Sequence, residues 1–499
     1  MSVHRRDFLG TLGAGSASTL LWVLGCAAPT QAVRRAPQVS NQVRLWLRDA
    51  VARLAAVYPS VHALAVSRRR TTVAHDVLGA GVARVRSDGV VFTVRSHDGA
   101  RREHLASSLT AASIAGAITA LGATRARAPI DFGRSPVTLA APPPLDERDL
   151  RRRVAHLLHA DAVLAPRIVY AAALVDHDDA TVWSIRPGRD LEQSLVRIRQ
   201  TVTRAAWNGP RPVVRHLERA WSGGLDDHTL TDAEIAATSE AVLEQMTPGT
   251  LEDGPRTVVL DPSVVALLFD AVARSLLAGR RAAPSPVAAP SSPAPAAAPS
   301  SPALLGSALI TLIDDPTAAG AYGGFAFDDE GQPAAPITLI DAGRVVDLAA
   351  SGSGRGRRAG HLAAARTEST HLVLSPGNVA TSELYGDGFI LEAGLDVFFD
   401  PASDRVRISC GRARELKAGS PTGRVYPDVE LVGSLTALLA ATDAISRAPV
   451  MFALDAPPSS GLAIPASPAF TDTSPPRWAS IAAPALRTRG FVRARRSHA

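Results

Sequence analysis

A chain of 499 residues is too long for one compact core and predicts two or three domains. Its 46% hydrophobic and 20% charged residues are ordinary for a globular protein. The formal net charge is +6, but Lys417 is the only lysine and the arginines are interleaved with Asp and Glu rather than with aromatic residues. The sequence therefore argues against a protein that binds nucleic acid.

The first 32 residues have the pattern of an export signal. Arg5 and Arg6 precede Phe8-Leu9, as in the twin-arginine motif, and the Gly/Ala-rich apolar stretch that follows is too short to span a bilayer. The stretch ends in Val23-Leu24-Gly25-Cys26, which resembles a lipobox, so Cys26 is the predicted site of lipidation. A general secretory signal, and simple cleavage after residues 30–32 without a lipid, stay open as alternatives. We expect export by the twin-arginine route to the periplasm or cell envelope, with a lipid anchor in the membrane.

Residues 38–247 have the pattern of an α+β domain with mostly antiparallel strands. Apolar residues at helical spacing predict helices over residues 38–58, 109–121, 146–158 and 231–246. Short runs rich in β-branched residues predict strands over residues 63–66, 82–85, 90–94, 168–175, 181–185 and 195–202. A hairpin turn is expected at Ser87-Asp88-Gly89, and Ser107 and Ser108 are expected to mark the start of the second helix.

A second domain is predicted over residues 250–455. It opens with a buried strand over residues 257–262, and a helix over 263–278 follows and ends at Gly279. Residues 282–302 are almost exclusively Ala, Pro and Ser, cannot bury a core, and are expected to form a tether that interrupts the domain. Residues 456–499 are expected to form a tail rich in Pro, Ala and Arg. Cys410 is expected to be a buried core residue without a disulfide partner.

The second domain also contains several short motifs in a fixed order. They are Asp314-Asp315-Pro316-Thr317, Gly320-Ala321-Tyr322-Gly323-Gly324, Phe327-Asp328-Asp329-Glu330-Gly331, Thr338-Leu339-Ile340-Asp341-Ala342-Gly343, Leu374-Ser375-Pro376-Gly377 and Leu431-Val432-Gly433-Ser434-Leu435. Together they resemble the TldD/PmbA family, the metallopeptidases also called modulators of DNA gyrase, from about residue 40 to about residue 455. The resemblance implies a two-domain α+β architecture with mostly antiparallel sheets and flanking helices. The acidic clusters taken alone are typical of solvated turns, and none of their carboxylates is expected to be catalytic.

The resemblance also places the family's zinc motif on the helix that follows Val258-Val259-Leu260-Asp261-Pro262. In active members an HExxxH sequence there supplies two zinc ligands and the general base, and a cysteine near the C-terminus supplies a third ligand. Here Phe269, Asp270 and Arg274 stand at those positions, and the segment around residues 451–453 has no cysteine. Phenylalanine has no lone pair to donate, and arginine is a fixed cation. We therefore expect no metal or other cofactor and assign no catalytic residue.

Three functions stay open from the sequence, and whether the chain is an enzyme is undecided at this point. The first is a non-catalytic family member that binds a peptide or pairs as a homodimer, or as a heterodimer with an active paralogue. The alternative is an active metal-dependent peptidase with relocated ligands, and the third is an assembly factor at the membrane surface. The remaining histidines have no cysteine or carboxylate at a useful spacing and are expected to be surface or capping residues: His156, His159, His361 and His371.

Overall fold

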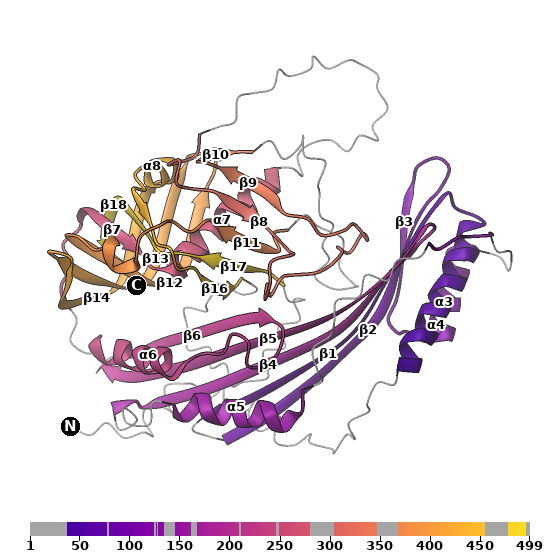
Figure 1. Ribbon diagram of the computed structural model, residues 1–499, viewed down its shortest axis with the longest axis horizontal. Coiled ribbons are helices and arrows are strands. Elements are labelled where there is room, and N and C mark those ends of the chain that lie inside the picture. Colours follow the sequence, from indigo (N-terminus) through magenta and orange to yellow (C-terminus); the bar gives the residue numbers. More distant parts are fainter. Residues whose placement is uncertain are drawn as a thin grey trace, which may run out of the picture.

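The computed structural model describes residues 37–76, 79–123, 126, 128–133, 145–160, 167–208, 211–245, 249–279, 304–346, 368–454 and 478–495. It consists of an N-terminal domain built on one long curved sheet and a C-terminal domain that lies over the concave face of that sheet (Figure 1). The fold is α+β with mostly antiparallel sheets, as the sequence predicts.

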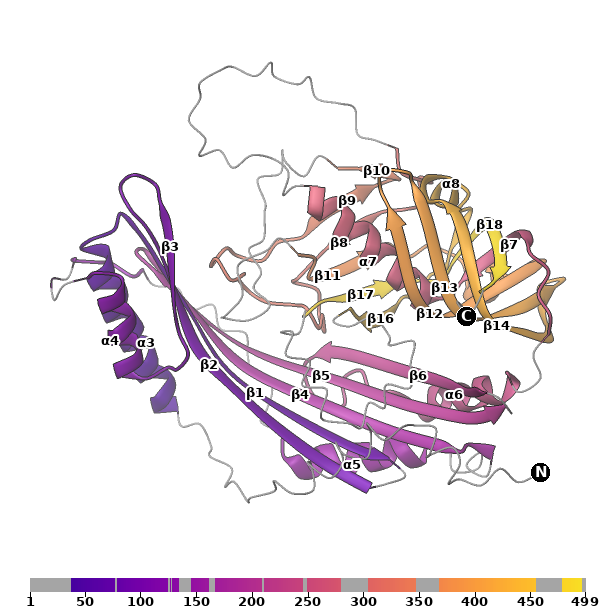
Figure 2. The ribbon, with the colours of Figure 1, turned by 180° about the vertical axis from the view of Figure 1, so that it is seen from behind.

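The N-terminal sheet is antiparallel throughout and has the strand order β3-β2-β1-β4-β5-β6. Its strands are β1 (Ser60–Asp76), β2 (Gly79–Arg95), β3 (Arg101–Ala106), β4 (Tyr170–Arg186), β5 (Arg189–Asn208) and β6 (Arg211–Ser222). Strands β4 and β5 contain 17 and 20 residues, far more than the usual five or six. The strand twist accumulates over this length, so the sheet curves and presents a concave face (Figures 1 and 2).

Helices cover the opposite face of this sheet. They are α3 (Pro37–Ala55), α4 (Ala111–Ala120), α5 (Glu147–His159) and α6 (Asp232–Glu244). Asp146 caps α5, and Thr231 forms a capping box with Glu234 at the start of α6. The cap of α4 is Thr110, whose side chain accepts a hydrogen bond from Ser113 N, so the predicted start at Ser107 and Ser108 is wrong.

The predicted hairpin turn at Ser87-Asp88-Gly89 is also wrong. These residues lie inside β2, where they pair with Arg68, Ser67 and Val66 of β1. The Asp88 carboxylate accepts hydrogen bonds from the side chains of Ser67 and Arg86. A turn-forming sequence is therefore held extended because a long partner strand satisfies both its backbone and its acidic side chain.

The C-terminal domain contains a closed five-stranded barrel. Its strands are β7 (Gly254–Leu260), β12 (Gly388–Asp400), β13 (Arg405–Lys417), β14 (Ser420–Ser434) and β18 (Leu486–Ala494). The barrel closes because β14 pairs with β18 as well as with β13. The short elements η3 (Thr381–Leu384), α8 (Leu435–Ala440) and β15 (Ala444–Ile445) lie around it, and β15 pairs with β18. Cys410 is buried in the barrel core, as expected.

A second six-stranded sheet lies beside the barrel, and one helix joins the two. The sheet has the order β10-β9-β8-β11-β17-β16, and its strands are β8 (Leu312–Asp314), β9 (Ile337–Asp341), β10 (Arg344–Val345), β11 (His371–Leu374), β16 (Val450–Ala453) and β17 (Ser480–Ala483). Helix α7 (Pro262–Gly279) contacts β12 of the barrel and β17 of this sheet. Barrel, helix and sheet therefore share one continuous hydrophobic core.

The strands β17 and β18 correct the predicted tail over residues 456–499. Within that range the structure describes residues 478–495, and they form these two strands, which are central to the sheet and to the barrel. The outward positions of β18 are occupied by Arg487, Arg489 and Arg493. These arginines separate the inward apolar residues, so the sequence does not show a clear apolar strand pattern. Only pairing with β7 and β14 identifies the segment as a strand.

Candidate functional site

Helix α7 carries the positions that the sequence assigns to the degenerate zinc motif. Asp261 caps the helix, since its carboxylate accepts hydrogen bonds from Val264 N at 2.9 Å and Ser263 Oγ at 2.7 Å. Desolvation by the surrounding atoms raises the pKa of Asp261 to about 6, against these hydrogen bonds, which favour its ionised form. Most other side chains of the helix are apolar, and it forms because they are buried between the barrel and the second sheet.

The three motif positions on α7 have different environments. Phe269 is fully buried in the hydrophobic core. Asp270 is 3% exposed, and its carboxylate pairs with the Arg274 guanidinium at 3.1 Å, one helical turn away. The Arg274 side chain itself is 59% exposed. A hydrocarbon ring, a guanidinium and an ion-paired carboxylate do not provide the set of three ligands that zinc requires.

Strand β16 brings the expected third-ligand segment to the same region. Helix α7 contacts this strand, and Phe452 packs against the core cluster that contains Phe269. The tertiary structure thus joins two places that are separated by about 180 residues in the sequence. An aromatic side chain stands at each place, Phe269 on α7 and Phe452 on β16, and both contribute to the packing of the hydrophobic core.

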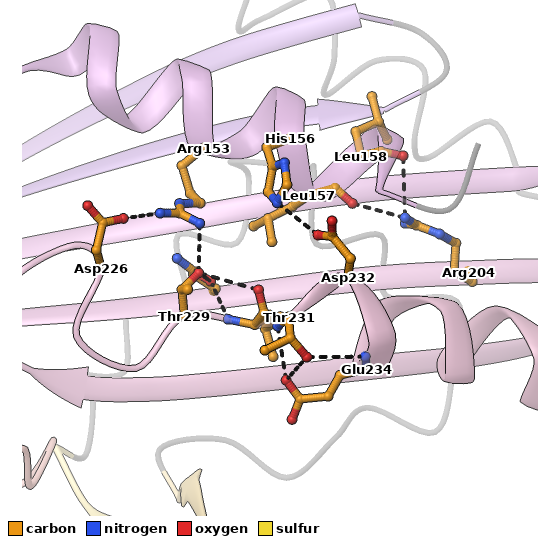
Figure 3. Close-up of polar contacts among 12 residues, drawn as sticks. Arg153, His156, Leu157, Leu158, Arg204, Asp226, Thr229, Thr231, Asp232 and Glu234 are labelled. Carbon is orange, nitrogen blue, oxygen red and sulfur yellow. Dashed lines mark hydrogen bonds and ion pairs between the residues drawn. The ribbon is translucent and has the colours of Figure 1, made fainter. Parts of the chain in front are cut away.

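The described histidines considered as substitute ligands do not converge on one site, because His156 and His159 lie on α5 and His371 lies on β11. His156 on α5 pairs with Asp232 at the start of α6, 2.9 Å away, within a network that also joins Arg153 to Asp226 and Thr229 (Figure 3). His159 is exposed at the end of α5, and His361 lies outside the described residues. Among the residues that the structure describes, no three His, Cys, Asp or Glu side chains are grouped to hold a metal ion.

His371 is buried on β11, away from these two. Its Nδ1 lies 2.8 Å from Ser480 Oγ on β17, and its backbone N–H donates to Asp314. Desolvation lowers the pKa of the imidazole to about 4, against the charges of Asp314 and Asp315, so it is neutral at pH 7. His371 is therefore a hydrogen-bonded core residue, and the expectation that it is a surface or capping residue is wrong.

Comparison with known proteins assigns the C-terminal domain. Residues 253–492 match the family model described as the PmbA/TldA metallopeptidase C-terminal domain. The C-terminal domain belongs to the TldD/PmbA family. No curated protein sequence matches it.

The similarity to solved structures covers both domains of the chain. A proposed modulator of DNA gyrase from Thermotoga maritima has a TM-score of 0.66, with 91% of this chain and 99% of that chain covered. TldE from Thermococcus kodakarensis has a TM-score of 0.64 with the same coverage. A proposed modulator of DNA gyrase from Bacteroides thetaiotaomicron has a TM-score of 0.62, covering 92% and 99%. Each is 13% identical to this chain, so the likeness establishes the shared fold alone.

The acidic and glycine-rich motifs shape a loop of the C-terminal domain that contacts the N-terminal sheet. Asp314 accepts hydrogen bonds from Thr370 and His371, and Asp328 accepts them from Glu330 N and Gln332 N. These bonds shape the loop over residues 315–332, which lies on the concave face of the N-terminal sheet. Position 323 accommodates only glycine, because a Cβ atom there would lie 1.9 Å from the carbonyl oxygen of Thr370.

The residues that receive this loop were not identified from the sequence. Gln193 Nε2 donates to Phe327 O at 3.0 Å, and Arg197 Nε donates to Tyr322 O at 2.8 Å. Arg197 and Arg68 both lie over the Trp478 ring, each 4.9 Å from its centroid. A buried Asp178 carboxylate lies between the two guanidinium groups, 3.4 and 3.6 Å from them. Polar side chains at alternate positions of the long strands are the only sequence signal for this face, and that pattern is equally typical of a solvated surface.

Arg5, Arg6 and Cys26 of the predicted export signal lie outside the described residues. In the part of the chain that the structure covers, no helix combines the length and the apolar character needed to cross a membrane.

Proposed function

We propose that this chain is a non-catalytic member of the TldD/PmbA family that acts in the cell envelope as a peptide-binding or partner subunit. The observation that carries the proposal is the occupation of the motif positions on α7. Phe269 is fully buried there, and Arg274 neutralises the carboxylate of Asp270.

The chemistry of a metallopeptidase explains why these substitutions matter. Such an enzyme needs a metal ion that lowers the pKa of a bound water, and a carboxylate that is free to accept the proton of that water. Phe269 cannot donate a lone pair, Arg274 repels a cation, and Asp270 is engaged in an ion pair. The barrel, the helix and the second sheet are nevertheless complete, which supports a role that depends on the shape of the scaffold.

The partner and the location are further parts of the proposal. By family resemblance, the chain pairs with itself or with an active paralogue, and a peptide is its ligand. The Arg5-Arg6 pair and Cys26 favour twin-arginine export and a lipid anchor. No nucleic-acid ligand is proposed.

The deciding experiment measures zinc in the purified mature protein after zinc loading and desalting. The natural protein is compared with Phe269→His/Arg274→His, and with Phe269→Leu/Arg274→Gln as the matched control that alters both positions without adding a ligand. We expect well under one zinc per chain in the natural protein and in the control, and a gain in the histidine variant. Far-UV circular dichroism and thermal unfolding verify that each variant folds.

Near-stoichiometric zinc in the natural protein would overturn the proposal and favour a peptidase with relocated ligands. That peptidase would show chelator-sensitive cleavage of a peptide, abolished by Asp270→Ala. Two further results would contradict the partner role: no co-purifying paralogue from the native envelope, and no binding of labelled unstructured peptides in fluorescence anisotropy.

The export proposal has its own test. Replacing Arg5 and Arg6 by lysine is expected to leave the chain in the cytoplasm, and Cys26→Ser is expected to remove the lipid, detected by mass spectrometry of the mature N-terminus. Unchanged export in the first variant would favour a general secretory signal, and an unlipidated natural protein would favour simple cleavage.

A further inference from the structure

The Arg215 guanidinium is buried where the two domains meet. Arg215 lies on β6 of the N-terminal sheet and is 7% exposed. Its Nη1 occupies the space over Gly411 of β13, because a Cβ atom at residue 411 would lie 2.1 Å from that nitrogen. The glycine therefore allows an arginine of the N-terminal domain to lie against the barrel.

Within the part of the chain that the structure describes, the side-on edge of this guanidinium has no partner. Its Nε and Nη2 atoms are both buried, and neither makes a hydrogen bond to a described residue. These two N–H groups point in the same direction and together match the two oxygens of a carboxylate or phosphate. Leaving such donors unsatisfied in a buried position is costly, so the native protein is expected to supply an acceptor.

The acids around Arg215 are already engaged elsewhere. Glu392 pairs with Arg412 and Arg414. The Asp261 carboxylate caps α7 and also accepts from Ala393 N. Asp428 is exposed, and the buried Cys410 thiol carries no charge because desolvation raises its pKa.

The charge of Arg215 is consequently under-compensated. Burial and the nearby Arg412 charge lower the pKa of Arg215 to about 10, although the charges of Glu392, Asp428 and Asp261 act in the opposite direction. The negative charges of these three acids repel an anion and weaken its binding, compared with binding to an isolated arginine. Their attraction to the guanidinium does not offset the cost of desolvating it. An additional negative charge at the Nε and Nη2 edge is therefore still favourable.

We propose that the side-on edge of Arg215 binds a small oxyanion, a carboxylate or a phosphate, at the junction of the two domains. The anion supplies two acceptors to Nε and Nη2 and neutralises the cation that β6 places against the barrel. The site is separate from the motif positions, since Asp261 and Asp270 lie nine residues apart, about 14 Å along α7. The proposal does not rest on the proposed function.

Thermal unfolding of the full mature protein tests the site. Melting temperatures are measured in chloride, phosphate and acetate buffers of equal ionic strength, which separates a tetrahedral from a planar oxyanion. A ligand at ten times its Kd is expected to raise the melting temperature by ~2 °C relative to chloride. Arg215→Lys keeps the charge but loses the two parallel donors, so its apparent affinity is expected to fall about tenfold. Arg215→Met is expected to abolish the response.

Two controls make the result decisive. Arg424→Met removes an exposed arginine of the barrel and is expected to respond like the natural protein. In chloride, Arg215→Met is expected to be at least as stable as the natural protein, because it removes an unpaired buried cation. An equal response of Arg215→Met to phosphate and acetate would indicate general ion effects and overturn the proposal. A crystal structure from phosphate with only water at Nε and Nη2 would overturn it as well.

Discussion

His371 illustrates how tertiary burial sets the protonation of a single residue. The imidazole lies between β11 and β17, where Ser480 Oγ is its hydrogen-bond partner and desolvation holds its pKa at about 4. In the unfolded chain the same group titrates near its ordinary value of about 6.5. Below that value the unfolded state binds more protons than the folded state, so the stability contributed by neutral His371 is lost as the pH falls.

The free energy of unfolding is therefore expected to decrease by about 2 kcal/mol between pH 7 and pH 5 because of His371 alone. His371→Asn keeps an acceptor at the position of Nδ1 without a group that titrates, and it is expected to remove that part of the pH dependence. Urea denaturation at the two pH values measures the difference, with exposed His159→Asn as the control. Parallel pH profiles for the natural protein and His371→Asn would contradict the expectation.

At the scale of an element, α7 shows how one helix joins two sheets. Its apolar side chains contact the barrel and the second sheet together, and Phe269 is part of the core that they share. Arg274 is one turn beyond Asp270 and largely exposed, whereas the Asp270 carboxylate with which it pairs is buried, so solvent screens only one side of the ion pair. The helix thus has one face determined by packing and one position that tolerates substitution.

Phe269→Ala is expected to lower the free energy of unfolding by about 3–5 kcal/mol, because it leaves a cavity between the barrel and the sheet. Arg274→Ala is expected to cost less, about 1.5 kcal/mol, because the exposed guanidinium leaves no cavity but the buried Asp270 carboxylate loses a charged partner. Urea unfolding at pH 7 compares the two variants. Similar losses in both would show that Phe269 is not a central packing residue.

At the scale of the whole molecule, the concave sheet face and the loop over residues 315–332 hold the domains together. Phe325 and Phe327 of that loop pack against Leu64 and Val66 of β1. In the same interface, the Trp478 ring makes cation–π contacts with Arg68 and Arg197. Contacts of this kind couple the unfolding of one domain to that of the other.

Trp478→Ala is expected to weaken this coupling and to divide one calorimetric unfolding transition into two. Trp46 packs against the core that α3 and α4 share with the N-terminal sheet, so Trp46→Ala is expected to lower the melting temperature without a second transition. Differential scanning calorimetry separates these outcomes. A single transition in Trp478→Ala would show that other interface contacts suffice for coupling.

The sequence by itself determined the features that depend on near neighbours in the chain. A few adjacent residues specify each helix start: the capping box of Thr231 and Glu234, the cap of α5 at Asp146, and the cap of α7 at Asp261. The ordered motifs of the second domain were sufficient to indicate its family and its α+β fold.

Only the tertiary structure decided the features that depend on distant partners. Residues 87–89 are extended because β1 pairs with them, and β18 is a strand because β7 and β14 lie on either side of it. The placement of Arg215 over Gly411, and of Trp478 against Arg68 and Arg197, likewise joins segments of different domains. Local propensity is worth a few tenths of a kcal/mol per residue, so long-range pairing and burial override it wherever the two disagree.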